Sequence, residues 1–259
     1  MSLQDGAERR FWEPGPRVRA AFGRALDLVF PPAALDGTAA PQSTGLSAQA
    51  WTRVQFIAEP LCDGCGAPFE YDVGERCAAC MAKPRAFSRA RAACLYDDAS
   101  PDLILKFKHA DRTDLARLFS RWVGRAAADL LAEADAVAPV PLHATRMLAR
   151  RYNQAAEIAR PLARTHRLAY LPDALVRARR TQTQGGKSGS GRRRNVAGAF
   201  EVPAARRARV KGRHILLIDD VMTTGATAEG CARALLAAGA RRVDLAVIAR
   251  VREAANISI

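Results

Sequence analysis

The sequence predicts an α/β fold, in which a mainly parallel sheet is flanked by helices and joined to a small N-terminal module. Apolar runs of strand length alternate with stretches of helical spacing over the second half of the chain, an order typical of parallel sheets. Two C-x-x-C pairs stand in the first third, where such periodicity is weak. With 259 residues, the chain can bury the core of one such domain and of a smaller module.

Three regions are expected along the chain. Residues 1–32 carry apolar side chains at helical spacing over 18–30, which predicts an amphipathic helix stopped by the two prolines that follow. Its polar face is not strongly basic, so packing on the main domain is favoured over contact with a membrane surface. Residues 33–88 form the cysteine module, and residues 89–259 form the main domain.

Within the main domain, strands and helices are expected in alternation. The predicted strands are 91–96, 135–141 and 215–218, and the predicted helices are 113–132, 145–165 and 228–236. Ligands of parallel α/β folds bind at the carboxyl ends of the strands, so chemistry is expected there.

Composition indicates the compartment. The chain is 49% hydrophobic, but no apolar run approaches the roughly 20 residues that span a bilayer. The first residues lack the basic and then apolar segments of a secretion signal. We therefore expect a cytoplasmic protein with reduced thiols, whose six cysteines are metal ligands or core residues rather than disulfides.

The net charge of +14 is concentrated in one segment. Residues 141–211 contain seventeen Lys and Arg residues and three acidic residues, whereas the rest of the chain is neutral. This clustering argues for an anionic partner. A pyrophosphate needs only a few cations, so a contact with nucleic acid stays open beside the alternative of a solvated basic surface.

The paired cysteines predict a structural metal site. Cys62 and Cys65 are followed, after eleven residues, by Cys77 and Cys80. Two such pairs supply four thiolates at tetrahedral geometry, the ligand set of structural zinc, and leave no coordination position open for catalysis. Two disulfides or four free thiols are the alternatives, which the expected reducing compartment disfavours.

The segment 215–227 carries the strongest functional signal. A strand ends in Asp219 and Asp220, and a turn containing Thr223, Thr224 and Gly225 opens a helix. Backbone N–H groups and the helix dipole at such a turn favour a phosphate monoester. Carboxylates accept hydrogen bonds from ribose hydroxyls or bind a divalent cation. A sugar 5′-phosphate with magnesium satisfies both features, and an ordinary strand–turn–helix is the alternative.

Two further segments contain basic side chains that suit a diphosphate. A proline-stiffened turn at Leu142 and His143 leads into Arg146 and Arg150, which share one helical face. Fixed guanidinium groups suit a pyrophosphate, and a basic solvent face is the alternative. Residues 179–200 form a glycine-rich basic loop that could close over the ligand.

These segments resemble known families. The Asp-Asp and Thr-Thr-Gly stretch resembles the 5-phosphoribosyl 1-pyrophosphate (PRPP) loop of type I phosphoribosyltransferases. The whole arrangement resembles the ComF family of competence-associated proteins, which pairs a double zinc ribbon with a domain of that type. The match covers nearly the full chain: residues 30–32, the C-x-x-C pairs, 106–109, Pro139 to His143, Arg151 to Gln154, 184–200 and the Asp-Asp turn.

Three departures from the family pattern stand out. Arg151-Tyr152 precedes Asn-Gln where relatives have Phe, and the loop around Lys187 is richer in glycine. An apparent first ribbon has lost its metal ligands, since the positions of its two knuckles hold Ala34, Gly37, Ser47 and Ala50. We interpret this stretch as a degenerate ribbon, with a Pro/Ala linker as the alternative.

The resemblance implies roles for individual residues. It gives Asp219 and Asp220 the ribose hydroxyls, with Mg2+ nearby, as the catalytic pair. The 5′-phosphate would be held by Thr223, Thr224, Gly225, Ala226 and Thr227, and the pyrophosphate by Leu142, His143, Arg146, Arg150 and Lys187. Structural zinc would be bound by Cys62, Cys65, Cys77 and Cys80.

The resemblance also implies a cellular role. Relatives support the entry of single-stranded DNA in transformable bacteria, from the cytoplasm or at the inner face of the membrane. Possible partners are therefore PRPP or a related phosphoribosyl ligand, single-stranded DNA and the DNA-uptake machinery. A non-catalytic PRPP or nucleotide sensor that binds single-stranded DNA is the alternative to a phosphoribosyltransferase. The sequence identifies neither the acceptor nor the oligomeric state.

Overall fold

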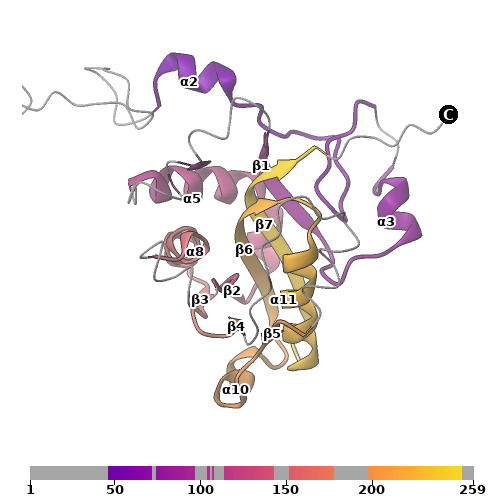
Figure 1. Cartoon of the computed structure of the whole chain (residues 1–259), viewed down its shortest axis with the longest axis vertical. Helices are drawn as coiled ribbons and strands as arrows, with labels where there is room; N and C mark the ends of the chain where they lie inside the picture. Colours follow the sequence, from indigo (N-terminus) through magenta and orange to yellow (C-terminus); the bar gives the residue numbers. More distant parts are fainter. Residues whose placement is uncertain are drawn as a thin grey trace, which may run out of the picture. The chain divides into compact units, whose positions relative to one another are not determined.

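The computed structural model describes the chain in seven stretches (Figure 1). The chain divides after Ala50 into two units, Met1–Ala50 and Trp51–Ile259. The described residues are 46–71, 74–96, 104–105, 107, 114–142, 152–177 and 198–252. The predicted helix at 18–30 and the positions Ala34 and Gly37 therefore lie outside the described residues. Ser47 lies just before helix α2 (Ala48–Arg53), and its Oγ accepts a hydrogen bond from the Ala50 N–H over 3.1 Å.

A five-stranded sheet of parallel strands forms the centre of the second unit, in the order β1-β7-β6-β2-β3. The strands are β1 (Ala90–Tyr96), β2 (Ala136–Pro139), β3 (Ala169–Tyr170), β6 (His214–Met222) and β7 (Arg242–Val251). The predicted α/β class with a parallel sheet is thus confirmed.

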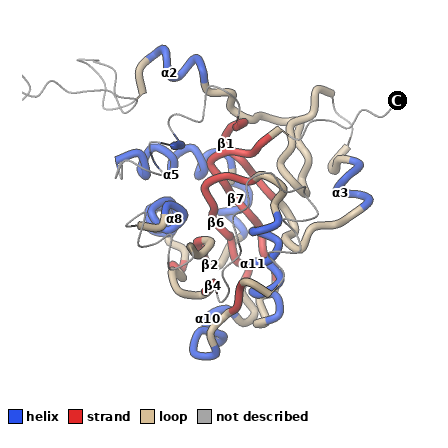
Figure 2. Tube along the Cα trace, in the orientation of Figure 1, coloured by secondary structure: helices blue, strands red, loops and turns tan. Residues whose placement is uncertain are grey.

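Helices cover both faces of this sheet (Figure 2). Helix α5 (Asp114–Ala126) packs on β1 and β7, and helix α8 (Gln154–Thr165) packs on β2 and β6. Helix α11 (Ala226–Ala237) packs on β6 and β7 from the opposite face. None of the described helices is both long and apolar enough to cross a membrane.

Strand β6 shows why the sheet is buried on both sides. Its residues 215–218 are fully buried. Ile215 and Leu217 belong to the apolar cluster that includes Leu235 of α11, and alternation along a strand turns Leu216 and Ile218 to the other face. A continuous apolar run is therefore expected for this strand, as in other parallel sheets.

Smaller elements complete the fold. They are helix α3 (Ala78–Ala82), helix α6 (Ala128–Glu133), the antiparallel pair β4 (Val176–Arg177) and β5 (Phe200–Glu201), the 3-10 helix η1 (Ala204–Arg206) and helix α10 (Arg207–Val210).

Two predicted elements differ from the structure, and one long strand was not predicted. The helix expected at 113–132 is two helices, because the backbone changes direction at Ala127 (φ −113°, ψ 28°). Beyond this break, Asp129 and Glu133 of α6 form ion pairs with Arg89, which precedes β1. Strand β6 continues past the two acids to Met222, since it keeps its register with β7 there. Strand β7 itself had no counterpart among the predicted strands.

A buried charge network occupies the amino-terminal edge of the sheet. Asp244 of β7 is fully buried, and its carboxylate accepts hydrogen bonds from Arg89 over 3.1 Å and from Arg242 over 3.2 Å. His214 of β6 lies 3.0 Å from the same carboxylate through Nε2, while its Nδ1 lies 3.0 Å from the Glu133 carbonyl oxygen. Because Asp244 is surrounded by basic groups, its charge is compensated where water is excluded.

Candidate functional site

The two acids of the predicted site lie at the carboxyl end of β6. Both side chains are partly buried. The carboxylate of Asp219 accepts a hydrogen bond from the backbone N–H of Asp220 over 2.9 Å, and the carboxylate of Asp220 accepts one from Val221 over 2.6 Å. These bonds hold both carboxylates near the carboxyl end of the strand, which continues to Met222 before the turn begins.

The turn that follows places the start of helix α11 beside the acids. Gly225 is the N-cap residue, with a left-handed backbone (φ 75°, ψ 3°), and its carbonyl accepts the first helical bond, from the Glu229 N–H over 2.9 Å. The earlier N–H groups of an α-helix have no acceptor inside the helix, and the helix dipole adds positive potential there. Ala226 and Thr227 are the first two residues of α11, so the turn can present N–H groups to an anion.

Glycine is strongly favoured at position 225. Its positive φ is a conformation that L side chains rarely adopt. A Cβ atom there would also lie 3.3 Å from Nη1 of Arg85 and 3.6 Å from the sulfur of Met222. The backbone conformation therefore favours glycine strongly, and a side chain would also press on Arg85.

Arg85 stabilises the turn through two hydrogen bonds. Its Nη1 donates to the carbonyl oxygen of Thr224 over 2.8 Å and to Oε1 of Glu229 over 3.0 Å. Glu229 is buried in the first turn of α11 and also pairs with Arg233. Although burial opposes it, the pKa of Glu229 is lowered, because Arg233 and Arg85 donate hydrogen bonds to the carboxylate.

Arg85 was not among the predicted site residues. Its partners Thr224 and Glu229 are 139 and 144 residues away in the sequence. No local pattern marks this arginine, which follows the second C-x-x-C pair in a stretch without periodicity. Only the closeness of Arg85 to the cysteine ribbon could have drawn attention to it.

The predicted pyrophosphate segment begins beside the same edge. Pro139 of β2 is registered with Ile218 of β6, and the Val140 N–H donates to the Ile218 carbonyl over 2.8 Å. Leu142 comes two residues later, at the end of the described stretch. The remaining predicted pyrophosphate ligands lie outside the described residues: His143, Arg146, Arg150 and Lys187.

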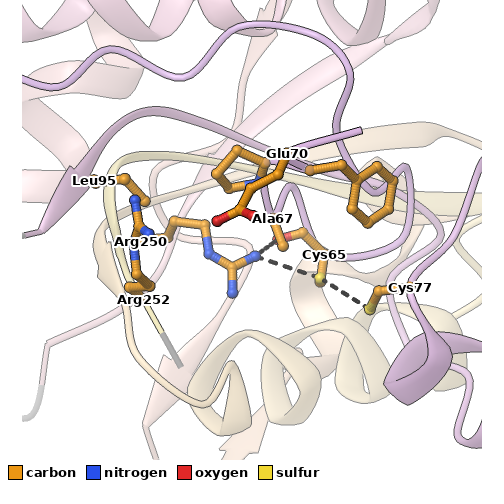
Figure 3. Close-up of a pocket in the computed structure, with 9 residues that line it drawn as sticks. Cys65, Ala67, Glu70, Cys77, Leu95, Arg250 and Arg252 are labelled. Carbon is orange, nitrogen blue, oxygen red and sulfur yellow. Dashed lines mark hydrogen bonds between the residues drawn. The ribbon is translucent and has the colours of Figure 1, made fainter. Parts of the chain in front are cut away.

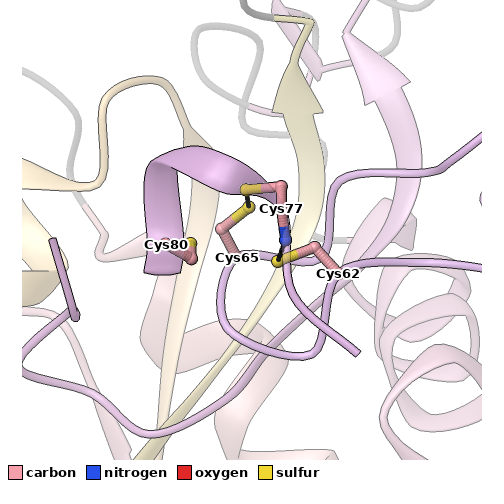
Figure 4. Close-up of side chains that lie close together, drawn as sticks. All are labelled: Cys62, Cys65, Cys77 and Cys80. Atoms are coloured by element: carbon pink, nitrogen blue, oxygen red, sulfur yellow. Dashed lines mark hydrogen bonds between the residues drawn. The ribbon is translucent and has the colours of Figure 1, made fainter. Parts of the chain in front are cut away.

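The four predicted metal ligands come together in the structure (Figure 4). The sulfur atoms of Cys62, Cys65, Cys77 and Cys80 all lie within 4.8 Å of one another. The sulfurs of Cys65 and Cys77 are 3.8 Å apart, and a zinc–sulfur bond of about 2.3 Å gives a tetrahedron with an edge of about 3.8 Å. This spacing fits four zinc ligands and excludes a disulfide between these two residues.

The backbone of the first knuckle supports the cluster. The Gly66 N–H donates to the Cys62 carbonyl over 2.7 Å, and Gly66 has a positive φ of 65°. A Cβ atom on Gly66 would lie 2.9 Å from the carbonyl oxygen of Ala90 at the start of β1. The Cys77 N–H in turn donates to the Cys62 sulfur over 3.2 Å. The knuckle is therefore folded tightly against the sheet.

Arg250, near the end of β7, adds a cation beside the sulfurs (Figure 3). Its buried Nη1 donates to the Cys65 carbonyl oxygen over 2.6 Å and to the Cys65 sulfur over 3.3 Å. A hydrogen bond to Cys62 and burial raise the pKa of Cys65 to about 12, and Arg250 opposes that rise. Since zinc with four thiolates carries two negative charges, the buried guanidinium at this place would stabilise a zinc ion held by the four cysteines.

A cavity of about 290 Å³ lies between the ribbon and the ends of β1 and β7. Figure 3 shows Arg250 and Arg252 beside Leu95 on one side and Glu70 above Cys65 on the other. The cavity therefore borders the cysteine cluster at the same edge of the sheet as the acids of β6.

The basic segment is only partly described. Eight of its seventeen cations fall in described residues, at 160, 164, 167, 177, 206, 207, 209 and 211. Arg160 pairs with Glu157, and both Arg206 and Arg209 pair with Asp173. Part of the positive charge is thus neutralised locally.

Comparisons with known proteins agree with this geometry. Residues 25–81 match the model of the double zinc ribbon domain, and residues 152–256 match that of the phosphoribosyl transferase domain. The chain is 31% identical over 205 residues to DNA utilization protein YhgH of Escherichia coli strain K12, covering 77% of this chain and 88% of that protein. It is 29% identical over 201 residues to Competence protein F of Haemophilus influenzae, covering 76% and 87%.

Among solved structures, orotate phosphoribosyltransferase from Aeropyrum pernix aligns with 61% of the chain and 80% of its own length, at 16% identity and a TM-score of 0.31. The assignment of the chain to a family therefore rests on the two domain models and on the sequence relatives, and not on this structural alignment.

Proposed function

The chain belongs to the ComF family, and we propose that it binds PRPP with Mg2+ at the carboxyl end of β6. One observation carries the proposal: the two carboxylates near the carboxyl end of β6 are followed, within a few residues, by a helix whose N-cap is a left-handed glycine. This arrangement offers acceptors for hydroxyl groups and donors for a phosphate within a few residues of each other.

Each part of the ligand has a counterpart in the chain. Thr223 to Thr227 would hold the 5′-phosphate through backbone N–H groups and hydroxyls, because the turn ends in the first residues of α11. Asp219 and Asp220 would accept hydrogen bonds from the ribose hydroxyls. The pyrophosphate would extend toward the end of β2, where Leu142, His143, Arg146 and Arg150 follow, and Lys187 would approach from the loop.

The reaction supported by this placement is transfer of the phosphoribosyl group. The bond between the anomeric carbon and pyrophosphate breaks through an oxocarbenium-like state, and a bond to the acceptor forms at the same carbon. Bound Mg2+ would supply charge compensation to the pyrophosphate. The carboxylates would orient the ribose and stabilise its developing positive charge, and the basic groups beside β2 would stabilise the departing anion.

We further propose a role in DNA utilization, in particular the uptake of single-stranded DNA during natural transformation. The names of the relatives, DNA utilization protein YhgH and Competence protein F, support this role. The excess of seventeen cations over three acids in residues 141–211 also supports it, because it exceeds what one pyrophosphate requires. A cytoplasmic location, with a peripheral contact at the inner face of the membrane, belongs to this proposal.

The same excess of charge favours a second candidate function. In it, the pocket senses PRPP or a nucleotide without turnover, and the basic segment holds single-stranded DNA. This candidate predicts affinity for single-stranded DNA that falls steeply as salt is raised, because counterions are released on binding.

Release of pyrophosphate distinguishes the two candidates. The zinc-loaded chain is incubated with PRPP and Mg2+ and with a panel of nucleobases and amines, and pyrophosphate is measured. Release by the wild type that Asp219→Asn and Asp220→Asn abolish supports the transferase. Glu133→Gln is the matched control, since this half-exposed acid lies at the opposite edge of the sheet. Binding of PRPP without release supports the sensor, and absence of both contradicts the proposal.

A further inference from the structure

The cysteine ribbon and the proposed phosphate turn are joined by one side chain. Cys80 belongs to helix α3, and Arg85 follows this helix after a two-residue gap. The guanidinium of Arg85 is mostly buried, with 16% of the side chain exposed, and it bonds to Thr224 and Glu229. Arg85 therefore lies between the proposed zinc ligands and the turn.

The bond from Arg85 to Thr224 orients the turn. In a trans peptide, the C=O of one residue and the N–H of the next point in opposite directions. Because Arg85 holds the carbonyl of Thr224 over 2.8 Å, the N–H of Gly225 points away from Arg85. In this orientation the Gly225 N–H is able to donate a hydrogen bond to a phosphate bound by the turn.

Arg85 also compensates an acid that would otherwise oppose an anion. Glu229 stands in the first turn of α11, and its carboxylate is buried. A negative charge there would weaken the attraction of the helix N-terminus for a phosphate. Arg85, at 3.0 Å, and Arg233 on the solvent side both pair with this carboxylate and reduce its effect.

The position of Arg85 depends in turn on the ribbon. Arg85 follows Cys80 by five residues in the chain, and on its other side Ala86 and Phe87 pack in the core of the main domain. Among the described residues, the buried cluster of the ribbon consists of Cys62, Cys65 and Cys80, with Ala67, Phe69 and Cys77 packed against it. A module with so little apolar core depends on metal for its fold. Loss of zinc would therefore release the ribbon side of the segment that carries Arg85, while Phe87 keeps the other side in the core.

We propose that Arg85 is a positioning residue that couples the four-cysteine zinc site to the phosphate turn, so that zinc occupancy sets the affinity of the turn for a sugar 5′-phosphate. This inference rests on the proposed function for the identity of the ligand. The coupling itself is a property of the chain that is measurable without ligand.

The test measures both sites in the full chain. Calorimetry records binding of PRPP with Mg2+, and metal analysis records the zinc content. Arg85→Gln, with zinc retained, is expected to weaken PRPP binding roughly tenfold, since hydrogen bonds to charged groups contribute about that factor. Removing zinc from the wild type is expected to weaken binding similarly, but to add little in Arg85→Gln. Arg85→Lys, which restores the charge without the planar fork, should recover part of the loss.

Arg91→Gln is the matched control. Arg91 is similarly buried, with 13% of its side chain exposed, and it ties Asp63 of the ribbon to the sheet at 2.6 Å. Its hydrogen bonds go to Asp63, Ala90 and Asp129, away from the turn. PRPP affinity in this variant should stay within about twofold of the wild type.

Hydrogen exchange of the backbone amides at 223–229 gives a second readout that requires no ligand. Faster exchange in Arg85→Gln and in the zinc-free wild type, but not in Arg91→Gln, supports the coupling. If PRPP fails to bind while exchange changes in this way, the proposed function is contradicted and the coupling is not. Unchanged exchange and unchanged PRPP affinity in zinc-loaded Arg85→Gln overturn the coupling. If the zinc-free chain unfolds, the test rests on the comparison of zinc-loaded Arg85→Gln with zinc-loaded Arg91→Gln, in both amide exchange at 223–229 and PRPP affinity.

Discussion

The two edges of the central sheet use acidic residues in opposite ways. At the amino edge, Asp244 is fully buried and is bonded to two arginines, and His214 lies beside it. At the carboxyl edge, Asp219 and Asp220 are partly buried and accept hydrogen bonds from the backbone of the next residue. A buried acid paired with cations serves the fold, whereas acids beside a helix N-terminus can meet a ligand.

This contrast predicts that substitutions at the two edges have separate effects. A change at the amino edge should reduce the free energy of unfolding, with ligand affinity altered only through unfolding. A change at Asp219 or Asp220 of the carboxyl edge should reduce ligand affinity and leave the free energy of unfolding nearly unaltered. The substitutions that follow test this separation.

The largest effect on stability is expected for Asp244→Ala. The substitution leaves Arg89, with 14% of its side chain exposed, and the buried His214 without their shared acceptor. Breaking a buried ion pair in this way costs about 3–5 kcal/mol. Chemical denaturation of the zinc-loaded chain measures the loss.

Asp173→Asn is the control for this prediction. Asp173 also pairs with two arginines, Arg206 and Arg209, but 42% of its side chain is exposed. Exposed ion pairs contribute at most about 1 kcal/mol. Equal losses in the free energy of unfolding for Asp244→Ala and Asp173→Asn would contradict the claim that the buried network stabilises the fold more than an exposed ion pair does.

A smaller effect on stability, with a larger one on binding, is expected for Gly225→Ala. The positive φ of 75° disfavours any side chain, and the new Cβ would press against Arg85 at 3.3 Å. The free energy of unfolding should fall by about 1–3 kcal/mol. PRPP affinity should fall with it, because the turn must shift to accommodate the methyl group. Gly239→Ala has a similar φ of 95° and lies after α11, so it should destabilise the chain without changing affinity.

The smallest of these effects on stability concerns Glu229, an acid at the carboxyl edge that is nevertheless buried and paired like Asp244. Its pKa in the folded chain is lowered from 4.5, so its charged form stabilises the fold above that pH. We expect Glu229→Gln to cost about 1 kcal/mol at pH 7.

The pH dependence of this cost has a defined sign. Since a lowered folded pKa means that the unfolded chain takes up the proton first, the difference between wild type and Glu229→Gln should be constant above about pH 5. It should shrink as the pH falls below 4.5 and through the folded value. Denaturation curves at several pH values measure it, and a difference that grows in acid would contradict the assignment of the charged form.

Features that are local in sequence were predictable, and features that join distant residues were not. The four cysteines span residues 62–80, and the turn from Asp219 to Thr227 is one continuous segment, so their spacing carries the geometry. Arg85 and Arg250 contact residues 139 to 185 positions away. Because the chain has forty Lys and Arg residues, local pattern does not indicate which of them meets a given carboxylate or sulfur.

Secondary structure shows the same limit. Strand 215–218 was expected from its apolar run, but its extension to Met222 depends on pairing with β7. The break at Ala127 occurs in a stretch of good helix formers, where propensity favours one continuous helix. In both places, contacts with another element decide what the local sequence leaves undetermined.

Titration calorimetry of PRPP and Mg2+ into the wild type, Asp219→Asn and Asp220→Asn tests the account most directly. The wild type should bind, ribose 5-phosphate should compete, and each variant should lose about tenfold or more in affinity while its unfolding midpoint stays within about 2 °C of the wild type. No binding by the wild type, or equal affinity in all three proteins, would contradict the assignment of these carboxylates to the ligand.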